Sequence, residues 1–222
     1  MMKSPLCTLF FLCATFALLA QNKGKWQGGA IVSPAFSTFS YNKDSYNDNF
    51  QLRLFLSGGL KARYFLQERL VLSAGVVYLS HGSGYEVPYG GPNLPEGTGV
   101  TEEGVYRVNS VGVPVGVNWL FKNDEKVRLS LGLEVMNAYT IKEELELTSV
   151  PEGSPGQLTE LEDFDKHFLA VSPNLGIAFQ LSERLVLLAS PVFNFEVIPN
   201  KVADVKSRML GFGSEFGLYL NL

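Results

Sequence analysis

Apolar and polar residues alternate one by one along eight stretches of this chain, and polar segments separate these stretches. A period of two predicts β-strands, because successive side chains of a strand point to opposite faces. Helical periodicity, with apolar residues every three or four positions, is absent. The sequence therefore predicts an all-β chain with strands at Trp26–Tyr41, Gln51–Leu66, Leu70–His81, Val105–Phe121, Val127–Thr148, His167–Leu181, Leu185–Ile198 and Ser207–Leu222.

The two faces of these strands differ in chemistry. Val111, Val113 and Val115, for example, alternate with Gly112 and Pro114. One face is almost purely aliphatic and aromatic, as lipid contact requires, whereas the other carries Gly, Ser, Asn and isolated charges that suit a narrow lumen. A closed barrel and an apolar helix of ~20 residues are the two structures that span a bilayer. Since no later stretch is such a helix, we expect an eight-stranded antiparallel up-and-down transmembrane β-barrel.

The connections alternate between short and long. Short turns follow the second, fourth and sixth strands, and longer polar loops cover Asn42–Phe50, Gly82–Gly104, Ser149–Lys166 and Pro199–Lys206. Membrane barrels have short periplasmic turns and longer extracellular loops, so both termini should lie in the periplasm. Aromatic residues near the strand ends are expected to form two girdles, namely Tyr64, Trp119, Phe121 and Phe179 by the short turns, and Tyr78, Tyr139, Phe193 and Phe195 toward the loops.

The N-terminal segment has the features of a secretory signal peptide. Lys3 precedes an apolar run that is too short for a membrane-spanning helix and that ends among small residues. Cleavage after Ala20 would give a signal peptide at residues 1–20 and a single barrel domain at residues 21–222. Both cysteines, Cys7 and Cys13, would then be removed, which would leave no disulfide and no cysteine-based metal site.

Composition and spacing narrow the chemistry further. The net charge of −4 argues against nucleic acid as a partner. The glycine-rich segment Gly82–Gly104 lacks the strand-to-helix context of a phosphate cradle, and it is expected to be an irregular loop. Glu143, Glu144 and Glu146 are expected to belong to a solvated acidic tip. We expect no cofactor, with outer-membrane lipid as the main partner and other envelope proteins as a class that the sequence leaves open.

Two histidines are present, and neither has the neighbours that a reaction or a metal would need. The alternation predicts that His81 points inward at the loop rim and that His167 points outward. A metal site needs two or more converging ligands, and a catalytic triad needs a nucleophile and a carboxylate near the base. Neither spacing is visible, so we expect no catalytic residue and no metal ligand.

The inward faces carry the charges of greatest interest. Lys61, Arg63, Arg128, Glu134 and Glu215 are predicted to form a charge network in the lumen. Arg53 and Glu196 are predicted to pair near the outer rim. Charges removed from water need partners, and eight strands leave an interior only wide enough for side chains. A structural plug is therefore the favoured interpretation, and a narrow ion path is the alternative.

Several segments resemble the outer-membrane β-barrel family that is common in Bacteroidota and includes PorT-like proteins. These are Gly28-Gly29-Ala30, Tyr106–Phe121 with Val111-Gly112-Val113-Pro114, the strand centre Leu131-Gly132-Leu133, and the terminal strand Phe216–Leu222. Many outer-membrane barrels end in Phe, whereas this chain ends in Leu222. The resemblance implies an outer-membrane barrel and, more narrowly, an accessory role in protein secretion.

The sequence thus predicts a non-enzymatic barrel of the bacterial outer membrane with a structural or interaction role, exported through the inner membrane with loss of its signal peptide. The PorT-like secretion accessory and a narrow channel for small solutes remain alternatives. A soluble lipocalin-type barrel is a further class. Its ligand site would require an apolar interior, against which the inward Lys61, Glu134 and Glu215 argue.

Overall fold

The computed structural model describes residues 26–41, 51–88, 101–124, 126–149, 158–160, 166–197, 200–202 and 205–222. The predicted signal peptide and much of the four predicted long loops lie outside these residues. The described part of the chain contains no helix, and so none that is long and apolar enough to cross a membrane.

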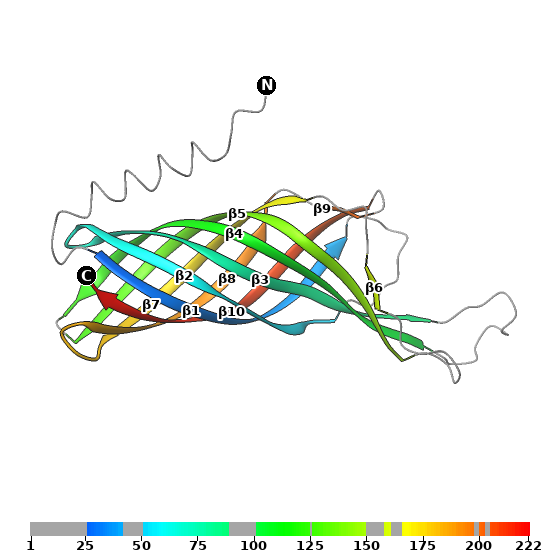
Figure 1. The fold of residues 1–222 in the computed structure, drawn as a ribbon, viewed down its shortest axis with the longest axis horizontal. Coiled ribbons are helices and arrows are strands. Elements are labelled where there is room, and N and C mark those ends of the chain that lie inside the picture. Colours follow the sequence, from blue (N-terminus) through cyan, green and yellow to red (C-terminus); the bar gives the residue numbers. More distant parts are fainter. Residues whose placement is uncertain are drawn as a thin grey trace, which may run out of the picture.

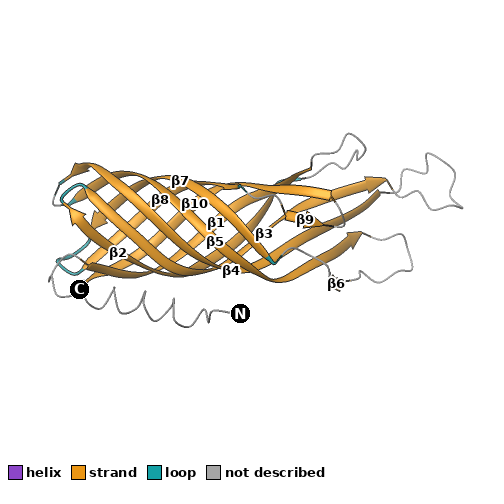
Figure 2. Ribbon diagram, turned by 90° about the horizontal axis from the view of Figure 1, so that it is seen from above, coloured by secondary structure: helices purple, strands orange, loops and turns teal. Residues whose placement is uncertain are grey.

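Eight long strands close into one antiparallel barrel (Figures 1 and 2). Each pairs with the next along the chain, and β1 (Trp26–Tyr41) pairs with β10 (Val205–Asn221) to complete the ring. Two short strands, β6 (Leu158–Glu160) and β9 (Asn200–Val202), pair with β5 and β10 at one end. The predicted fold class is therefore confirmed, with long strands β1 (Trp26–Tyr41), β2 (Arg53–Gln67), β3 (Leu70–Pro88), β4 (Thr101–Asn123), β5 (Val127–Ser149), β7 (His167–Gln180), β8 (Leu185–Glu196) and β10 (Val205–Asn221).

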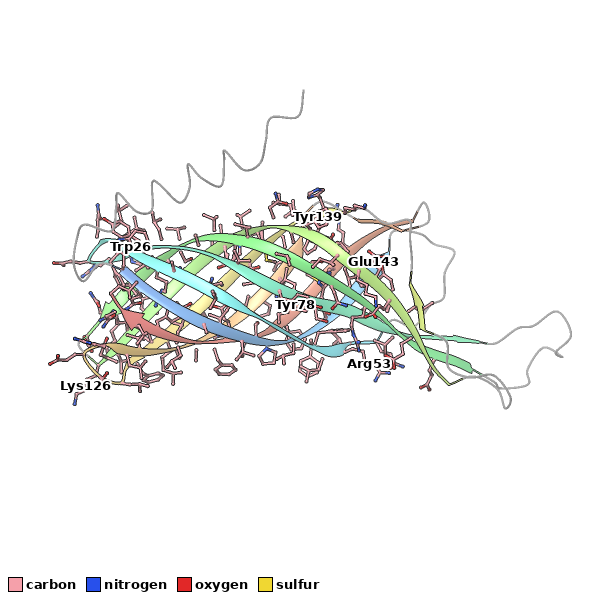
Figure 3. All side chains as sticks on the ribbon, viewed as in Figure 1. Trp26, Arg53, Tyr78, Lys126, Tyr139 and Glu143 are labelled. Atoms are coloured by element: carbon pink, nitrogen blue, oxygen red, sulfur yellow. The ribbon has the colours of Figure 1, made fainter. Side chains whose placement is uncertain are left out.

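The barrel has a turn end, where the short connections lie, and a loop end, where the long connections lie. β1 begins and β10 ends at the turn end. On the outer face there, the rings of Trp26 and Tyr64 lie 4.7 Å apart, and Trp119 and Phe121 are exposed. Tyr78 and Tyr139 lie toward the loop end (Figure 3). The aromatic residues thus lie near both ends of the apolar belt, as girdles would.

The second predicted loop is much shorter than the sequence suggested, because strand pairing continues through its glycines. β3 runs on to Pro88 and β4 begins at Thr101, so the expected irregular structure was wrong at both ends of Gly82–Gly104. Gly82 lies in the ladder opposite Arg107, where a Cβ atom would overlap the carbonyl oxygen of Tyr106. Glycine here permits a close approach of two strands rather than ending one of them.

The outer face of the barrel is apolar along every long strand. Leu60 is 68% exposed and Val115 is 55% exposed, and similar residues follow at alternate positions on neighbouring strands. A soluble monomer rarely presents apolar patches of more than a few hundred Å², so this belt is suited to lipid. The inner face is lined by glycine, serine and a few charged groups, and its stacked layers determine what the lumen can do.

Candidate functional site in the barrel lumen

Lys61 lies at the centre of the lumen and is bound by two carboxylates. Its Nζ lies 2.8 Å from Oε2 of Glu134 and 2.7 Å from Oε2 of Glu215. Both contacts have the length of charge-assisted hydrogen bonds. Lys61 is 7% exposed, and both carboxylate side chains are largely shielded from solvent. One ammonium group therefore joins β2, β5 and β10 across the interior.

Glycines on the neighbouring strands make room for the side chains of Lys61 and Tyr219. Gly29 and Gly75 lie directly opposite Lys61 on β1 and β3. A Cβ atom at Gly75 would lie 2.7 Å from Cγ of Lys61, and one at Gly29 would lie 2.6 Å from Cδ1 of Tyr219. Real Cβ atoms do not approach other carbon atoms this closely, so a larger residue would displace the side chains around the lysine. The glycine content of the inner face thus has a direct structural role.

Arg63 and Arg128 lie one layer nearer the turn end and form no ion pair with a carboxylate of the described residues. Arg63 Nη1 donates to Oε1 of Gln27 at 3.2 Å, and Arg128 Nη2 donates to Oε1 of Gln180 at 3.2 Å. Both guanidinium groups lie over the ring of Phe65, at 5.9 and 5.5 Å from its centroid. Amide oxygens and aromatic faces therefore stabilise these cations.

The predicted lumen network thus separates into two layers. Lys61, Glu134 and Glu215 come together, whereas Arg63 and Arg128 belong to the layer around Phe65. Gln27 also donates from Nε2 to Oδ1 of Asn221 at 2.8 Å. Beyond this layer a recess of about 610 Å³ opens at the turn end. The inward positions of Gln27 and Phe65 follow from the alternation, but their contacts depend on which strands face each other across the barrel.

Two small cavities flank the Lys61 layer. The one toward the loop end measures about 60 Å³ and the one toward the turn end about 30 Å³, and both are lined by Lys61, Glu134 and Glu215. A water molecule needs roughly 10–15 Å³ of such space, so each cavity has room for a few waters at most. The Lys61 layer separates the two cavities.

An aromatic and apolar cluster occupies part of the lumen toward the loop end. Phe39, Tyr106, Val108 and Met209 are buried together there. His81 lies beside this cluster, with its ring centroid 6.2 Å from that of Phe39 and 5.3 Å from that of Phe168. The sequence correctly predicted that His81 would point inward, where it packs against two aromatic rings and also lines the cavity on the loop side of Lys61.

His167 points outward and packs its ring edge-on against Tyr139, at 5.0 Å between centroids. The two histidines therefore lie on opposite faces of the barrel wall. Among the residues that the structure describes, no group of three or more His, Cys, Asp or Glu side chains could hold a metal ion.

The predicted pair of Arg53 and Glu196 is not formed. Arg53 Nη2 donates to Oε1 of Gln51 at 3.3 Å, and Oε2 of Glu196 accepts a hydrogen bond from the backbone N–H of Met209 at 2.8 Å. β1 and β10 separate β2 from β8 in the barrel. The hydrogen-bond donor to Glu196 is therefore on the adjacent strand β10. The predicted pair was inferred only from the similar distance of Arg53 and Glu196 from the turn end, and it was wrong.

The acidic tip of β5 is less solvated than the sequence suggested. A bulge at Ile141 shifts the pairing with β4, so Glu143 turns inward, is 1% exposed and accepts a hydrogen bond from the hydroxyl of Tyr106. The Lys142 ammonium hydrogen-bonds to Glu144 and lowers the pKa of that carboxyl. Glu143 is thus a correction to the predicted solvated loop, and one extra residue in a strand is enough to invert the side chains that follow it as far as the next bulge.

Together these layers define a closed antiparallel membrane barrel with a charged, side-chain-filled lumen. The chain belongs to the family of outer membrane protein beta-barrel domains, whose model matches residues 19–195. This match confirms the outer-membrane barrel class that the sequence predicted, and it assigns the chain to the bacterial outer membrane. No curated protein sequence matches the chain.

Several solved barrel structures are similar to this chain. Neisserial surface protein A is 15% identical, with 89% of this chain and 97% of that chain covered and a TM-score of 0.42. OprG from Pseudomonas aeruginosa is 10% identical, with 89% and 95% covered and a TM-score of 0.48. The outer membrane protease OmpT from Escherichia coli is 7% identical, with 89% and 97% covered and a TM-score of 0.46.

Proposed function

We propose that this protein is a non-enzymatic outer-membrane barrel with a closed lumen, which acts through contacts made by its outer surface and its loop end. The observation that carries the proposal is the position of Lys61 between Glu134 and Glu215, which fills the lumen between two cavities of about 60 and 30 Å³. A barrel closed in this way holds a fixed shape and presents its loops on a rigid frame.

Three successive layers support a closed lumen rather than a solute channel. The first surrounds Phe65 with Arg63 and Arg128, the second is centred on Lys61, and the third is the cluster beside His81. Eight strands leave space for side chains only, and here charged, amide and aromatic groups occupy that space. The channel alternative would require several of these contacts to break at once.

The surroundings of the histidines support a non-enzymatic role. His81 packs beside the aromatic rings of Phe39 and Phe168, and His167 packs on Tyr139, so each imidazole acts as a packing group. Acid–base catalysis would instead place an imidazole within hydrogen-bond reach of a reacting group.

The proposal includes orientation and export. The loop end would face the cell exterior and the turn end the periplasm, after removal of residues 1–20 by cleavage behind Ala20. Lipid would surround the apolar belt, and other envelope proteins would meet the loop end. An accessory role in secretion, as the resemblance to PorT-like proteins suggests, stays a prediction that no contact in the described residues specifically favours.

Solute exclusion from liposomes tests the proposed function. Proteoliposomes that contain the folded protein should swell in isosmotic solutions of small sugars no faster than protein-free liposomes, because the Lys61 layer blocks the lumen. A known open porin in the same lipid gives the positive control. Swelling rates that decrease as the sugar becomes larger would contradict the proposal, since such size dependence is the property of an open pore.

A further inference from the structure

The recess at the turn end is much larger than the cavities around Lys61. It measures about 610 Å³, whereas the cavity on the loop side of Lys61 measures about 60 Å³. Protein pockets that bind small molecules enclose about 300–1,000 Å³, so the recess has room for such a ligand. Phe65 and Arg128, which belong to β2 and β5, both line it, and we call it the turn-end recess.

The two arginines of this layer retain unused hydrogen-bond donors. Arg128 lines the turn-end recess, and Arg63 lies further inside, where it lines the small cavity on the turn side of Lys61. A guanidinium group carries five N–H donors. Within the described residues, each arginine makes one hydrogen bond, to Gln27 or to Gln180. Most of the donors of Arg128 are therefore available to a ligand in the recess.

The inner face between the Lys61 layer and the strand ends at the turn end carries an excess of positive charge. The described strands place three cations there, Lys61, Arg63 and Arg128, and two carboxylates, Glu134 and Glu215. Lys61 binds both carboxylates, so neither arginine has one of its own. Charges shielded from water need a partner of opposite sign. An anionic group beside Arg128 would supply the missing partner.

The turns around the mouth of the recess carry mixed charge. Glu68 and Glu183 line the recess, but both are exposed, and Arg69 and Arg184 follow them directly in the chain. Water and salt screen exposed charges, so these glutamates neutralise Arg128 only weakly. Glu125, in the turn between β4 and β5, lies outside the described residues, and a Glu125→Gln variant measures its contribution.

Amide and aromatic side chains in the recess favour a peptide over a free inorganic anion. Asn123 Nδ2 donates to the carbonyl oxygen of Glu68 at 3.0 Å, which leaves its own amide oxygen without a hydrogen bond among the described residues. Gln67, which also lines the recess, makes no side-chain hydrogen bond with the described residues. A peptide backbone offers the N–H and C=O groups that such amides bind. The ring of Phe65 adds an apolar surface for a side chain.

We propose that the turn-end recess binds the C-terminal end of a short peptide. The guanidinium group of Arg128 pairs with the terminal carboxylate, and Gln67 and Asn123 hydrogen-bond to the peptide backbone. Arg63 adds positive potential from further inside the lumen. In the proposed orientation the recess faces the periplasm, but binding itself requires neither that orientation nor a closed lumen.

Calorimetric titration of the folded, detergent-solubilised protein with N-acetyl-trialanine tests the proposal. The peptide should bind saturably, and its C-terminal amide should bind about tenfold or more weakly, because it lacks the charge that strengthens the hydrogen bonds to Arg128. Arg128→Gln should reduce the affinity for the acid to that for the amide. The matched control is Lys126→Gln, two residues away in the exposed turn, which should bind like the wild type. Heat-modifiable mobility on a gel verifies that each variant is folded.

Any of four results would overturn the proposal. The wild type could bind the acid and the amide equally, or bind neither at millimolar concentration, and these two measurements need no variant. Acetate could bind as tightly as the peptide, which would identify a site for a free carboxylate. Glu125→Gln could bind the peptide tenfold more tightly than the wild type, which would make Glu125 the natural partner of Arg128. None of these results depends on liposome swelling, so the closed lumen and the peptide site can fail separately.

Discussion

Nζ of Lys61 lies 2.7 Å from Oε2 of Glu215, although the two residues are 154 positions apart in the chain. The same ammonium group also binds Glu134 at 2.8 Å. One cation is therefore shared by two carboxylates that would otherwise face each other in a poorly solvated space. This sharing makes Lys61, rather than either glutamate, the residue whose loss leaves the largest uncompensated charge.

Replacement of the shared lysine should destabilise the barrel. Lys61→Met leaves Glu134 and Glu215 without their cation, and removal of one partner from a buried ion pair costs about 3–5 kcal/mol. The adjacent small cavities admit some water, so we expect a value at the lower end of this range. Urea unfolding of the folded protein in lipid or detergent, followed by tryptophan fluorescence, measures the change in the free energy of unfolding.

The glutamate variants provide the control for this measurement. Glu215→Gln leaves a one-to-one pair of Lys61 and Glu134, so its cost should stay within about 1 kcal/mol. Adding Glu134→Gln and Glu215→Gln to Lys61→Met removes every charge of the layer and should recover most of the lost stability. Equal costs for Lys61→Met and Glu215→Gln, or no recovery in the triple variant, would mean that Lys61 is not shared as described.

A charged residue in the apolar belt should destabilise the barrel more, the closer it lies to the middle of the bilayer. Val115 is 55% exposed on the outer face of β4, near the middle of the belt. Val115→Arg should cost about 2–4 kcal/mol, because its guanidinium group is forced into hydrocarbon, whereas the same change near an interface costs about 0–1 kcal/mol. Leu66→Arg, at the turn end of β2, is the matched control. Equal unfolding free energies for the two variants in lipid would be incompatible with the belt.

Orientation can be tested with single cysteines at the two ends. Lys166 and Lys126 are both exposed and lie at the loop end and the turn end respectively. On intact cells, a membrane-impermeant thiol reagent should label Lys166→Cys but not Lys126→Cys until the outer membrane is permeabilised. The chain's own cysteines lie in the predicted signal peptide, so the background should be low. The reverse labelling pattern would place the loop end in the periplasm.

The strands could be predicted from the sequence because a period of two is a local property. The alternation around Val115 on β4 gave both the strand and its lipid-facing side, and the inward parity of Lys61, Glu134 and Glu215 followed in the same way. Their mutual contact could not be derived from parity alone. It depends on strand register and tilt, which determine which inward residues share a layer.

The sequence-based errors have specific physical causes. The bulge at Ile141 inverts the alternation beyond it, and a bulge leaves no reliable sign in a single sequence, so the burial of Glu143 was missed. Gly82 was interpreted as a loop residue because glycine is common in loops, whereas here it allows close strand approach. The pair of Arg53 and Glu196 was inferred only from their similar distance from the turn end. Arg53 instead binds Gln51, two residues away in the chain, and Glu196 binds the backbone of Met209 on the adjacent strand.

Conductance across a planar lipid bilayer tests the closed lumen most directly. The wild-type barrel, with insertion verified by heat-modifiable mobility of the same sample, should show no steady single-channel steps, because the Lys61 layer and the layers on either side of it fill the lumen. Large and stable single-channel steps in the wild type would contradict the account and would favour a channel.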